Sequence, residues 1–374
     1  MPSFAAHRAD LAQLADQHRI RRLLPRQGTD FASNDYLALA SAPRLRNAVA
    51  AALAEGVAVG SGGSRLLRGN SDEHEALEAE AAAFFGSEAS LYFASGFAAN
   101  AALFATLPQR GDLVVYDALV HASAHEGMRL GRATCVAAEH NQVDAFEAAI
   151  RQWRKGGGTG TPWIAVESLY SMDGDRAPLA ALAKLADAQD AILLIDEAHA
   201  TGVCGAAGRG LAEDLEGRGN VVTLRTCGKA MGCEGALVCG PRIVRDFLIN
   251  RGRGFIFSTA PSPLMARAVR ESLHILADEP KRRERLHDLV RHAERALAPA
   301  GVQPTGSQIL PLVIGDDAAT MRAAEALQAA GFDVRGIRPP TVPRGTSRLR
   351  LSLTLNVTTE DVDRLAALLQ EVVP

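Results

Sequence analysis

The sequence predicts an α/β fold: a large domain with a mainly parallel sheet covered by helices, followed by a smaller α+β C-terminal domain. From Ser90 onward short apolar runs alternate with helical patterns, an alternation typical of parallel strands joined by helices. The chain has 374 residues, 47% of them hydrophobic and 22% charged, which suits a globular protein with more than one core. The same composition excludes a disordered or collagen-like chain.

The predicted elements follow one another in three parts, an N-terminal arm (1–39), a large domain (40–260) and a connecting helix with the small domain (261–374). The arm has helical apolar spacing from about Ala5 to Leu24 and ends before Pro25. The large domain has predicted helices at 43–55 and 71–85 and strands at 91–94, 113–116, 163–167, 191–195, 221–224 and 236–238. A long helical stretch at 261–298 precedes predicted strands at 309–314, 332–337 and 349–353 and helices at 318–330 and 359–372.

Charge and cysteine content narrow the class of protein. The formal net charge is -3, and no run of Lys or Arg is long enough to indicate a nucleic-acid surface. Arg19, Arg21 and Arg22 form the densest N-terminal cluster, which is either a solvated helix face or an anion site. The five cysteines lack CxxC pairing, so neither a disulfide framework nor a zinc or other metal site is predicted. Because no apolar stretch has signal-peptide or membrane-spanning length, we expect a cytoplasmic protein.

The strand at 191–195 runs directly into Asp196, Glu197 and His199. In open α/β sheets ligands bind at the carboxyl ends of the strands, so chemistry is expected at this edge. Asp196 either caps a helix or supplies the anion that keeps a heteroaromatic nitrogen protonated.

A second strand, at 221–224, leads to Thr226 and Lys229. A lysine among small residues just past a buried strand would be desolvated, and its lowered pKa would suit a Schiff-base lysine. The alternative is an ordinary solvated surface charge. Thr226 lies three residues earlier and can offer a hydroxyl to a phosphate.

Three further strand ends carry polar groups. The turn around Gly96 and Phe97 joins a strand to a helix and would present free N–H groups to an anion, unless it is only a turn. His121 follows another strand and is either a surface histidine or an aromatic plate against a cofactor ring. Glu167 and Ser171 follow a third and bring an acid and a hydroxyl to the same edge.

These segments together resemble the α-oxoamine synthases, a branch of the fold-type I pyridoxal 5'-phosphate (PLP) enzymes, over nearly the whole chain. The stretches that carry the resemblance are SNDYL at 33–37, GSGGSR at 60–65, SGFAAN at 95–100, HAS at 121–123, SMDGD at 171–175, DEAHATG at 196–202 and IRPPTVP at 337–343. No single stretch is specific, but the set is.

The resemblance implies a PLP site with a role for each matching residue. Lys229 would carry the cofactor as a Schiff base, Asp196 would pair with the pyridinium nitrogen, and His121 would stack on the ring. The remaining implied cofactor contacts are Ser171 and His199 at the phenolic oxygen, Gly96, Phe97 and Thr226 at the phosphate, and Ser258 and Thr259 from the partner subunit of a homodimer.

The resemblance also implies substrate contacts. Arg350 and Asn34 would hold the amino-acid carboxylate, Arg21 and Thr341 would line the acyl-chain site, and His121 would face the substrate. An arginine suits a carboxylate because its planar fork donates two hydrogen bonds.

The implied reaction joins an amino acid to an acyl thioester with loss of CO2. Two of the quoted stretches, at 62–65 and 337–341, favour the biotin-pathway branch, which uses L-alanine and a pimeloyl thioester of coenzyme A or of an acyl carrier protein. A carrier protein would need a basic surface, for which Arg251, Arg253 and the charged run at 281–285 are candidates. Branches that use other amino acids with acetyl, succinyl or palmitoyl thioesters are the alternatives.

Two other classes of protein are less well supported. A non-catalytic interaction protein on the same fold would not need Lys229, Asp196, His121 and His199 together. A nicotinamide dehydrogenase is disfavoured because no GxGxxG follows the first strand.

Overall fold

The computed structural model describes residues 3–373 and divides into two compact units. The large unit contains Leu37–Ser171 and Arg176–Arg283; the small unit contains the residues up to Tyr36, Met172–Asp175 and the residues from Glu284 onward. The predicted domain limits at 39 and 260 stay a prediction, and residues 1, 2 and 374 of the predicted arm and small domain lie outside the described residues. Within the described residues no helix is both long and apolar enough to cross a membrane.

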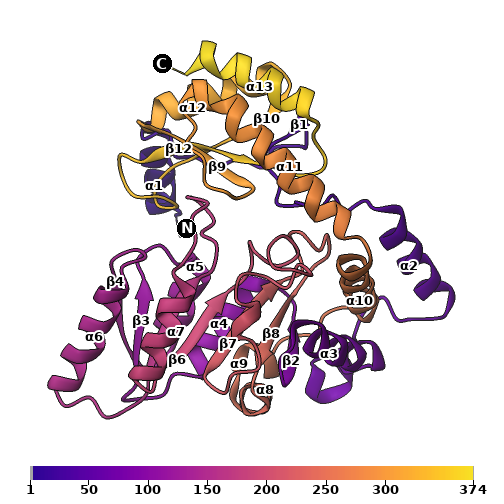
Figure 1. The fold of residues 1–374 in the computed structure, drawn as a ribbon, viewed down its shortest axis with the longest axis vertical. Coiled ribbons are helices and arrows are strands. Elements are labelled where there is room, and N and C mark those ends of the chain that lie inside the picture. Colours follow the sequence, from indigo (N-terminus) through magenta and orange to yellow (C-terminus); the bar gives the residue numbers. More distant parts are fainter. Residues whose placement is uncertain (1–2, 374) are drawn as a thin grey trace. The chain divides into compact units, whose positions relative to one another are not determined.

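A seven-stranded sheet organises the large unit (Figure 1). Its strand order is β2-β8-β7-β6-β5-β3-β4, and every strand except β8 runs in the same direction. The strands are β2 (Ala89–Phe93), β3 (Leu113–Asp117), β4 (Thr134–Ala138), β5 (Pro162–Glu167), β6 (Ile192–Asp196), β7 (Val221–Thr226) and β8 (Ala236–Gly240). The mainly parallel α/β sheet is therefore confirmed. The sequence reading missed β4, an edge strand whose side chains are mostly not buried.

Helices cover both faces of this sheet, because alternate strand residues feed two separate cores. Trp163 and Ala165 of β5 belong to one hydrophobic cluster, whereas Ile164 and Val166 belong to the other. The helices of the large unit are α2 (Pro43–Ala54), α3 (Asp72–Phe85), α4 (Gly96–Thr106), α5 (Ala122–Leu130), α6 (Val143–Lys155), α7 (Leu179–Ala188), α8 (Arg242–Arg251), α9 (Arg253–Ile256) and α10 (Pro263–Asp278), with short turns η1 (Arg65–Gly69) and η2 (Glu213–Leu215). The cluster that contains Trp163 includes residues of α4, α5 and α8, and the other includes residues of α6 and α7.

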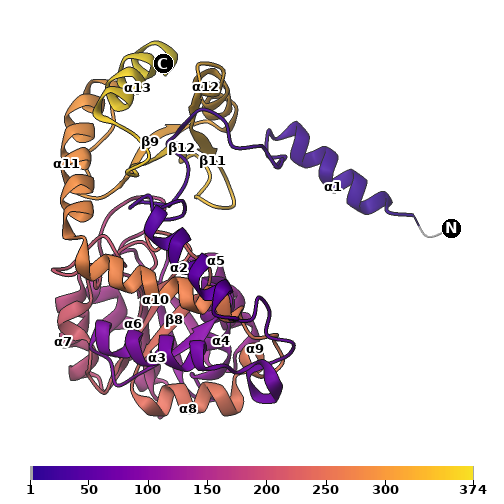
Figure 2. The ribbon, with the colours of Figure 1, turned by 90° about the vertical axis from the view of Figure 1, so that its right-hand side faces the viewer.

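The small unit has α+β architecture, as predicted (Figure 2). Its antiparallel sheet has the order β11-β12-β9, and a short β1 pairs with β10. The strands are β1 (Thr29–Asp30), β9 (Ile309–Gly315), β10 (Phe332–Asp333), β11 (Arg335–Ile337) and β12 (Ser347–Ser352); the helices are α1 (Ala5–Asp16), α11 (Pro280–Leu297), η3 (Ala298–Ala300), α12 (Asp317–Ala329) and α13 (Thr359–Val372).

Two helix predictions were too long. The stretch 261–298 is two helices, because Pro280 cannot continue α10 and instead begins α11. The N-terminal helix ends at Asp16 rather than near Leu24, since His18 adopts a left-handed conformation with φ 55°.

A buried ion cluster ties β7 to the loop that follows β6. The Arg225 side chain is fully buried and contacts the carboxylates of Glu197, at 3.5 Å, and Glu216. Its guanidinium also lies over the Phe85 ring, 4.0 Å from the centroid. Burial raises the pKa of Glu197 and the positive charge of Arg225 lowers it. Burial has the larger effect, so the pKa is raised to about 7.

We expect Arg225→Met to lower the free energy of unfolding by about 3–5 kcal/mol, because it leaves two buried carboxyl groups without their cation. Urea unfolding followed by circular dichroism would measure this. The control is Arg242→Met, which removes the cation of the exposed Arg242–Glu88 pair and should change the same quantity by less than about 1 kcal/mol. Equal losses in the two variants would contradict the structural role of the buried cluster.

Candidate active site

The carboxyl ends of β5, β6 and β7 place three polar side chains on one face of the sheet. Glu167 and Asp196 are paired in register, and Asp196 is paired with Leu224, two residues before Thr226. By strand alternation Glu167, Asp196 and Thr226 point to the face that α4 and α5 cover. The sequence therefore places its candidate chemistry at one sheet edge within the large unit.

Lys229 and His199 meet at this edge. The Lys229 Nζ atom lies 2.7 Å from Nε2 of His199, which is 5% exposed. Each side chain lies three residues past the end of its own strand, Lys229 after β7 and His199 after β6. An amine beside an imidazole can exchange a proton with it, as a Schiff-base lysine that also acts as a base requires.

Asp196 is held by hydrogen-bond donors on both oxygens. Asn100 Nδ2, from the inner face of α4, donates to Oδ2 at 2.7 Å, and the Ala198 N–H donates to Oδ1 at 2.9 Å. These two donors fix the orientation of the carboxyl group. The structure is compatible with both roles considered for Asp196, the local cap and the partner of a ring nitrogen. Oδ1 closes a local turn with the Ala198 N–H, whereas Oδ2 faces α4.

A chain of hydrogen bonds links Asp196 to His121. Asn100 Nδ2 also donates to Ser123 Oγ at 3.0 Å, and Ser123 Oγ lies 2.8 Å from His121 Nδ1. The residue His121 as a whole is exposed. Partial burial of the ring lowers the pKa of His121. Asp196 opposes this shift and Lys229 adds to it, so both groups lie close enough to act on the imidazole electrostatically.

The start of α4 forms a cradle against β7. Ser95 caps the helix by accepting a hydrogen bond from the Ala98 N–H at 3.1 Å, and the preceding N–H groups of Gly96 and Phe97 begin the helix. A Cβ atom on Gly96 would lie 2.5 Å from Cγ2 of Thr226. Only glycine therefore allows the backbone at position 96 to approach Thr226 so closely. The N–H groups at the start of α4 and the Thr226 hydroxyl make this a suitable place for a phosphate group.

Apart from His121, the predicted substrate residues lie in the small unit, where they form two groups. Arg350 is 7% exposed; its Nη2 donates to Asn34 Oδ1 at 3.1 Å and its Nη1 to Ser352 Oγ at 2.7 Å. Arg21 lines a cavity of about 630 Å³ together with Arg335 and Arg338. Thr341 is exposed, and its N–H donates to the Arg338 carbonyl at 3.1 Å.

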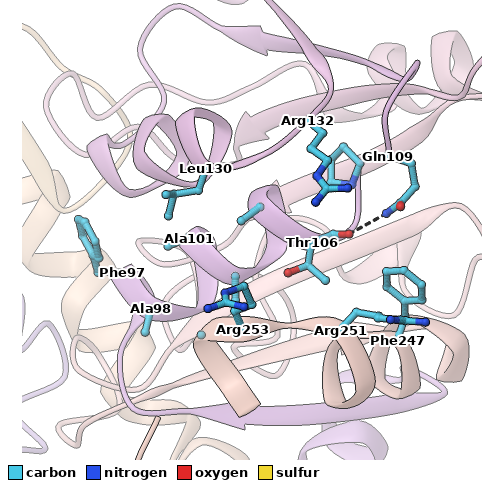
Figure 3. Close-up of a pocket in the computed structure, with 14 residues that line it drawn as sticks. Phe97, Ala98, Ala101, Thr106, Gln109, Leu130, Arg132, Phe247, Arg251 and Arg253 are labelled. Carbon is cyan, nitrogen blue, oxygen red and sulfur yellow. Dashed lines mark hydrogen bonds between the residues drawn. The ribbon is translucent and has the colours of Figure 1, made fainter. Parts of the chain in front are cut away.

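A second cavity, of about 930 Å³, lies on the outer face of α4 in the large unit (Figure 3). Its lining combines an alanine-rich helix face with Phe97, Leu130 and three arginines, Arg132, Arg251 and Arg253. No acidic side chain lines it, and none of the three arginines forms an ion pair with any of residues 3–373. Ser258 and Thr259, which follow α9, are exposed.

The other candidate carrier-protein surface, the charged run at 281–285, is partly structural. Arg283 is 6% exposed and donates to the Leu276 carbonyl at 2.6 Å, and Arg282 pairs with Glu279 at 2.6 Å. These two arginines therefore stabilise the large unit.

Sequence reasoning did not assign a role to two residues at the site, Asn100 and Glu167. Asn100 lies one helical turn past Gly96, so the spacing alone could have placed it near the cradle. Glu167 ends a buried strand and is only 3% exposed. The signal was an acid at the end of an apolar run, as at Asp196.

Comparison with known proteins identifies the family of this chain. Residues 26–369 match the aminotransferase class I and II family. An 8-amino-7-oxononanoate synthase from Anaeromyxobacter dehalogenans is 43% identical over 348 residues, 92% of this chain and 86% of that protein. A solved 8-amino-7-oxononanoate synthase from Francisella tularensis has a TM-score of 0.76 at 27% identity, covering 92% of this chain and 97% of the other.

A serine palmitoyltransferase from S. paucimobilis, solved with a bound PLP–myriocin aldimine, has a TM-score of 0.89 at 26% identity and covers 99% of this chain and 97% of that chain. The chain therefore belongs to the aminotransferase class I and II family. Within that family it groups with the 8-amino-7-oxononanoate synthases, which confirms the resemblance to the α-oxoamine synthases.

We expect Gly96→Ala to weaken PLP binding on the order of tenfold, because the added methyl group must displace Thr226 or the start of α4. Titration of the apo-protein with PLP, followed by absorbance, would give the dissociation constant. The control is Gly219→Ala, since a Cβ there meets nothing within 4 Å. Unchanged PLP affinity in Gly96→Ala would show that no phosphate lies in the cradle.

Proposed function

We propose that this enzyme condenses L-alanine with a pimeloyl thioester, with loss of CO2 and release of the thiol, to give 8-amino-7-oxononanoate for biotin synthesis. The observation that carries the proposal is the contact between Lys229 and His199 at the strand end beside Asp196. The family membership and the names of the relatives support the choice of reaction.

The residues at the strand ends fit PLP as the cofactor. Lys229 would bind its aldehyde carbon, Asp196 its pyridine nitrogen, and Gly96, Phe97 and Thr226 its phosphate. His121 would stack on the ring, with Ser171 and His199 at the phenolic oxygen. When bound, PLP withdraws electrons from the substrate carbon that loses first a proton and later CO2.

Lys229 and His199 can move the protons that the reaction requires. An uncharged Lys229 amine would accept the α-proton of the amino acid and return a proton to the same carbon after CO2 has left. His199, 2.7 Å away, is positioned to keep the amine oriented and to share that proton. Asp196 is oriented by hydrogen bonds from Asn100 Nδ2 and the Ala198 N–H, and its carboxylate would accept a hydrogen bond from a protonated ring nitrogen.

The small unit would supply substrate recognition. We assign the amino-acid carboxylate to Arg350 and Asn34, which is supported by the buried guanidinium and its orientation by Ser352. Arg21 and Thr341 would line the acyl chain, and the arginine-lined cavity beside Arg21 suits a chain that ends in a carboxylate, as pimeloyl does.

A product assay tests the reaction. Purified protein loaded with PLP is offered L-alanine, glycine or L-serine with pimeloyl, acetyl, succinyl and palmitoyl thioesters, and the products are identified by mass. Pimeloyl thioesters of coenzyme A and of acyl carrier protein are compared to define the donor. We expect 8-amino-7-oxononanoate from alanine and a pimeloyl donor, and none from Lys229→Ala, which has no amine to hold the cofactor or accept the proton.

Serine palmitoyltransferase activity is the second candidate, favoured by the close structural match to that enzyme. The same assay separates the two, because L-serine and palmitoyl thioester would then be the preferred pair. Glycine C-acetyltransferase and 5-aminolevulinate synthase activities would be recognised by the glycine arms. No product from any pair would contradict the proposed enzyme activity.

We further propose that the protein is a homodimer in the cytoplasm, in which Ser258 and Thr259 complete the partner's cofactor site. Both side chains are exposed, and Phe257 just before them is 71% exposed. The cavity on the outer face of α4 is bounded by α9, which directly precedes these residues. A second copy would cover its apolar floor and could offer acceptors to Arg132, Arg251 and Arg253. None of the five cysteines, which all lie within residues 3–373, forms a disulfide, and this supports a reducing compartment.

Mixed dimers test this assignment. The double variant Ser258→Ala/Thr259→Ala and the variant Lys229→Ala should each be weakly active or inactive alone. If the two hydroxyls act in the partner's site, mixing the unfolded variants and refolding them together produces one intact site per mixed dimer, and activity returns. Activity that stays absent in the mixture, with dimers confirmed by light scattering, would place the hydroxyls in their own subunit's site, and full activity of the double variant alone would place them outside any site.

A further inference from the structure

Glu167 is a buried acid at the centre of the strand-end site. It is the last residue of β5, lies beside Asp196 in register on the neighbouring parallel strand, and is 3% exposed. Strand alternation directs both side chains toward the α4 face. Two carboxyl groups therefore lie side by side, yet nothing in the proposed chemistry uses the second one.

The Glu167 carboxyl contacts two loops. Its Oε2 accepts a hydrogen bond from the Ser171 N–H at 3.3 Å, and the backbone N–H of His121 lies close enough to lower the pKa of the carboxyl. The other oxygen, Oε1, is buried and accepts no hydrogen bond from another side chain in the described part of the chain. One side chain thus joins the loop after β3 to the loop after β5.

We propose that Glu167 is a positioning residue that fastens the backbones of His121 and Ser171 beside Asp196, so that both side chains are held ready for the cofactor. The inference rests on the proposed function for the identity of the cofactor. Glu167 itself would touch neither PLP nor substrate. Its effect would pass through the two loops that it contacts.

The charges around Glu167 indicate that it acts as an uncharged carboxyl group. Burial and the neighbouring Asp196 raise the pKa of Glu167 to about 8, whereas Lys229 and the N–H groups of Ser171 and His121 oppose this. Asp196, by contrast, has Asn100 and Ala198 as donors. A neutral Glu167 would add no second negative charge beside Asp196.

Two substitutions separate shape from charge. Glu167→Gln keeps an acceptor oxygen and stays neutral, so PLP affinity should remain near that of the wild type. Glu167→Ala removes the acceptor for both N–H groups, and the PLP dissociation constant should rise on the order of tenfold. Apo-protein titration measures both. The control is Glu216→Ala, which removes a carboxyl group that is 4% exposed near the start of β7 and should lower stability without changing PLP affinity.

Amide hydrogen exchange in the apo-protein tests the contact itself. The Ser171 and His121 amides should exchange on the order of tenfold faster in Glu167→Ala than in Glu167→Gln or Glu216→Ala, because only the alanine variant frees them. This measurement needs no cofactor. If the wild type failed to bind PLP, the proposed function would be wrong, while the exchange rates would still decide whether Glu167 fastens the two loops.

The pH dependence of apo-protein stability provides a third test. A carboxyl group with a pKa of 4.5 unfolded and about 8 folded contributes stability that is complete below pH 4.5 and is lost as the pH rises to about 8. The wild type should therefore lose stability relative to Glu167→Gln across that interval. Unchanged amide exchange and PLP affinity in Glu167→Ala would overturn the positioning role, and a Glu167→Gln variant as defective as Glu167→Ala would overturn the neutral carboxyl group.

Discussion

The site depends on one geometric constraint, the common face shared by the carboxyl ends of three parallel strands. In β5, β6 and β7 every second side chain points into the core beneath α4. The last side chain that points this way in each strand therefore lies on the same face, at the edge of the sheet. Glu167, Asp196 and Thr226 occupy these positions. Because register is fixed by burial on both faces, a shift of one residue would turn all of these groups toward the opposite face.

The electrostatic character of the site follows from that constraint. Two adjacent carboxyl groups cannot both be charged without a free-energy cost in a buried setting, and burial together with Asp196 raises the pKa of Glu167 to about 8. Asn100 reaches Asp196 because α4 begins with a glycine that fits against Thr226. The same asparagine continues through Ser123 to His121. Packing of α4 thus sets both the cradle and the charge distribution.

Much of the fold and the core of the site could be predicted from sequence, because strand-end polar residues interrupt strongly apolar runs. Lys229 and His199 were placed at one edge by this rule, and the structure brings them into contact. Contacts that depend on three dimensions were not predictable in the same way. The link from Asn100 to Asp196 spans 96 positions, and the acceptor role of Glu167 depends on loop geometry. The edge strand β4 lacked the apolar pattern that reveals buried strands.

In the proposed assignment, the cofactor contacts lie at strand ends of the large unit and the acyl-chain contacts lie in the small unit. This separation would allow relatives with different substrates to share one structure. The proposed cofactor contacts mostly sit on or near strand ends packed against α4, where a change would disturb the core. Arg21 and Thr341, proposed to meet the acyl chain, are exposed residues outside strands and helices. Substitution there costs little stability, so the acyl specificity can change while the chemistry is kept. A serine palmitoyltransferase matches nearly the whole fold at 26% identity. Under the proposed assignment, the two proteins could differ in acyl chain through a few residues away from the sheet.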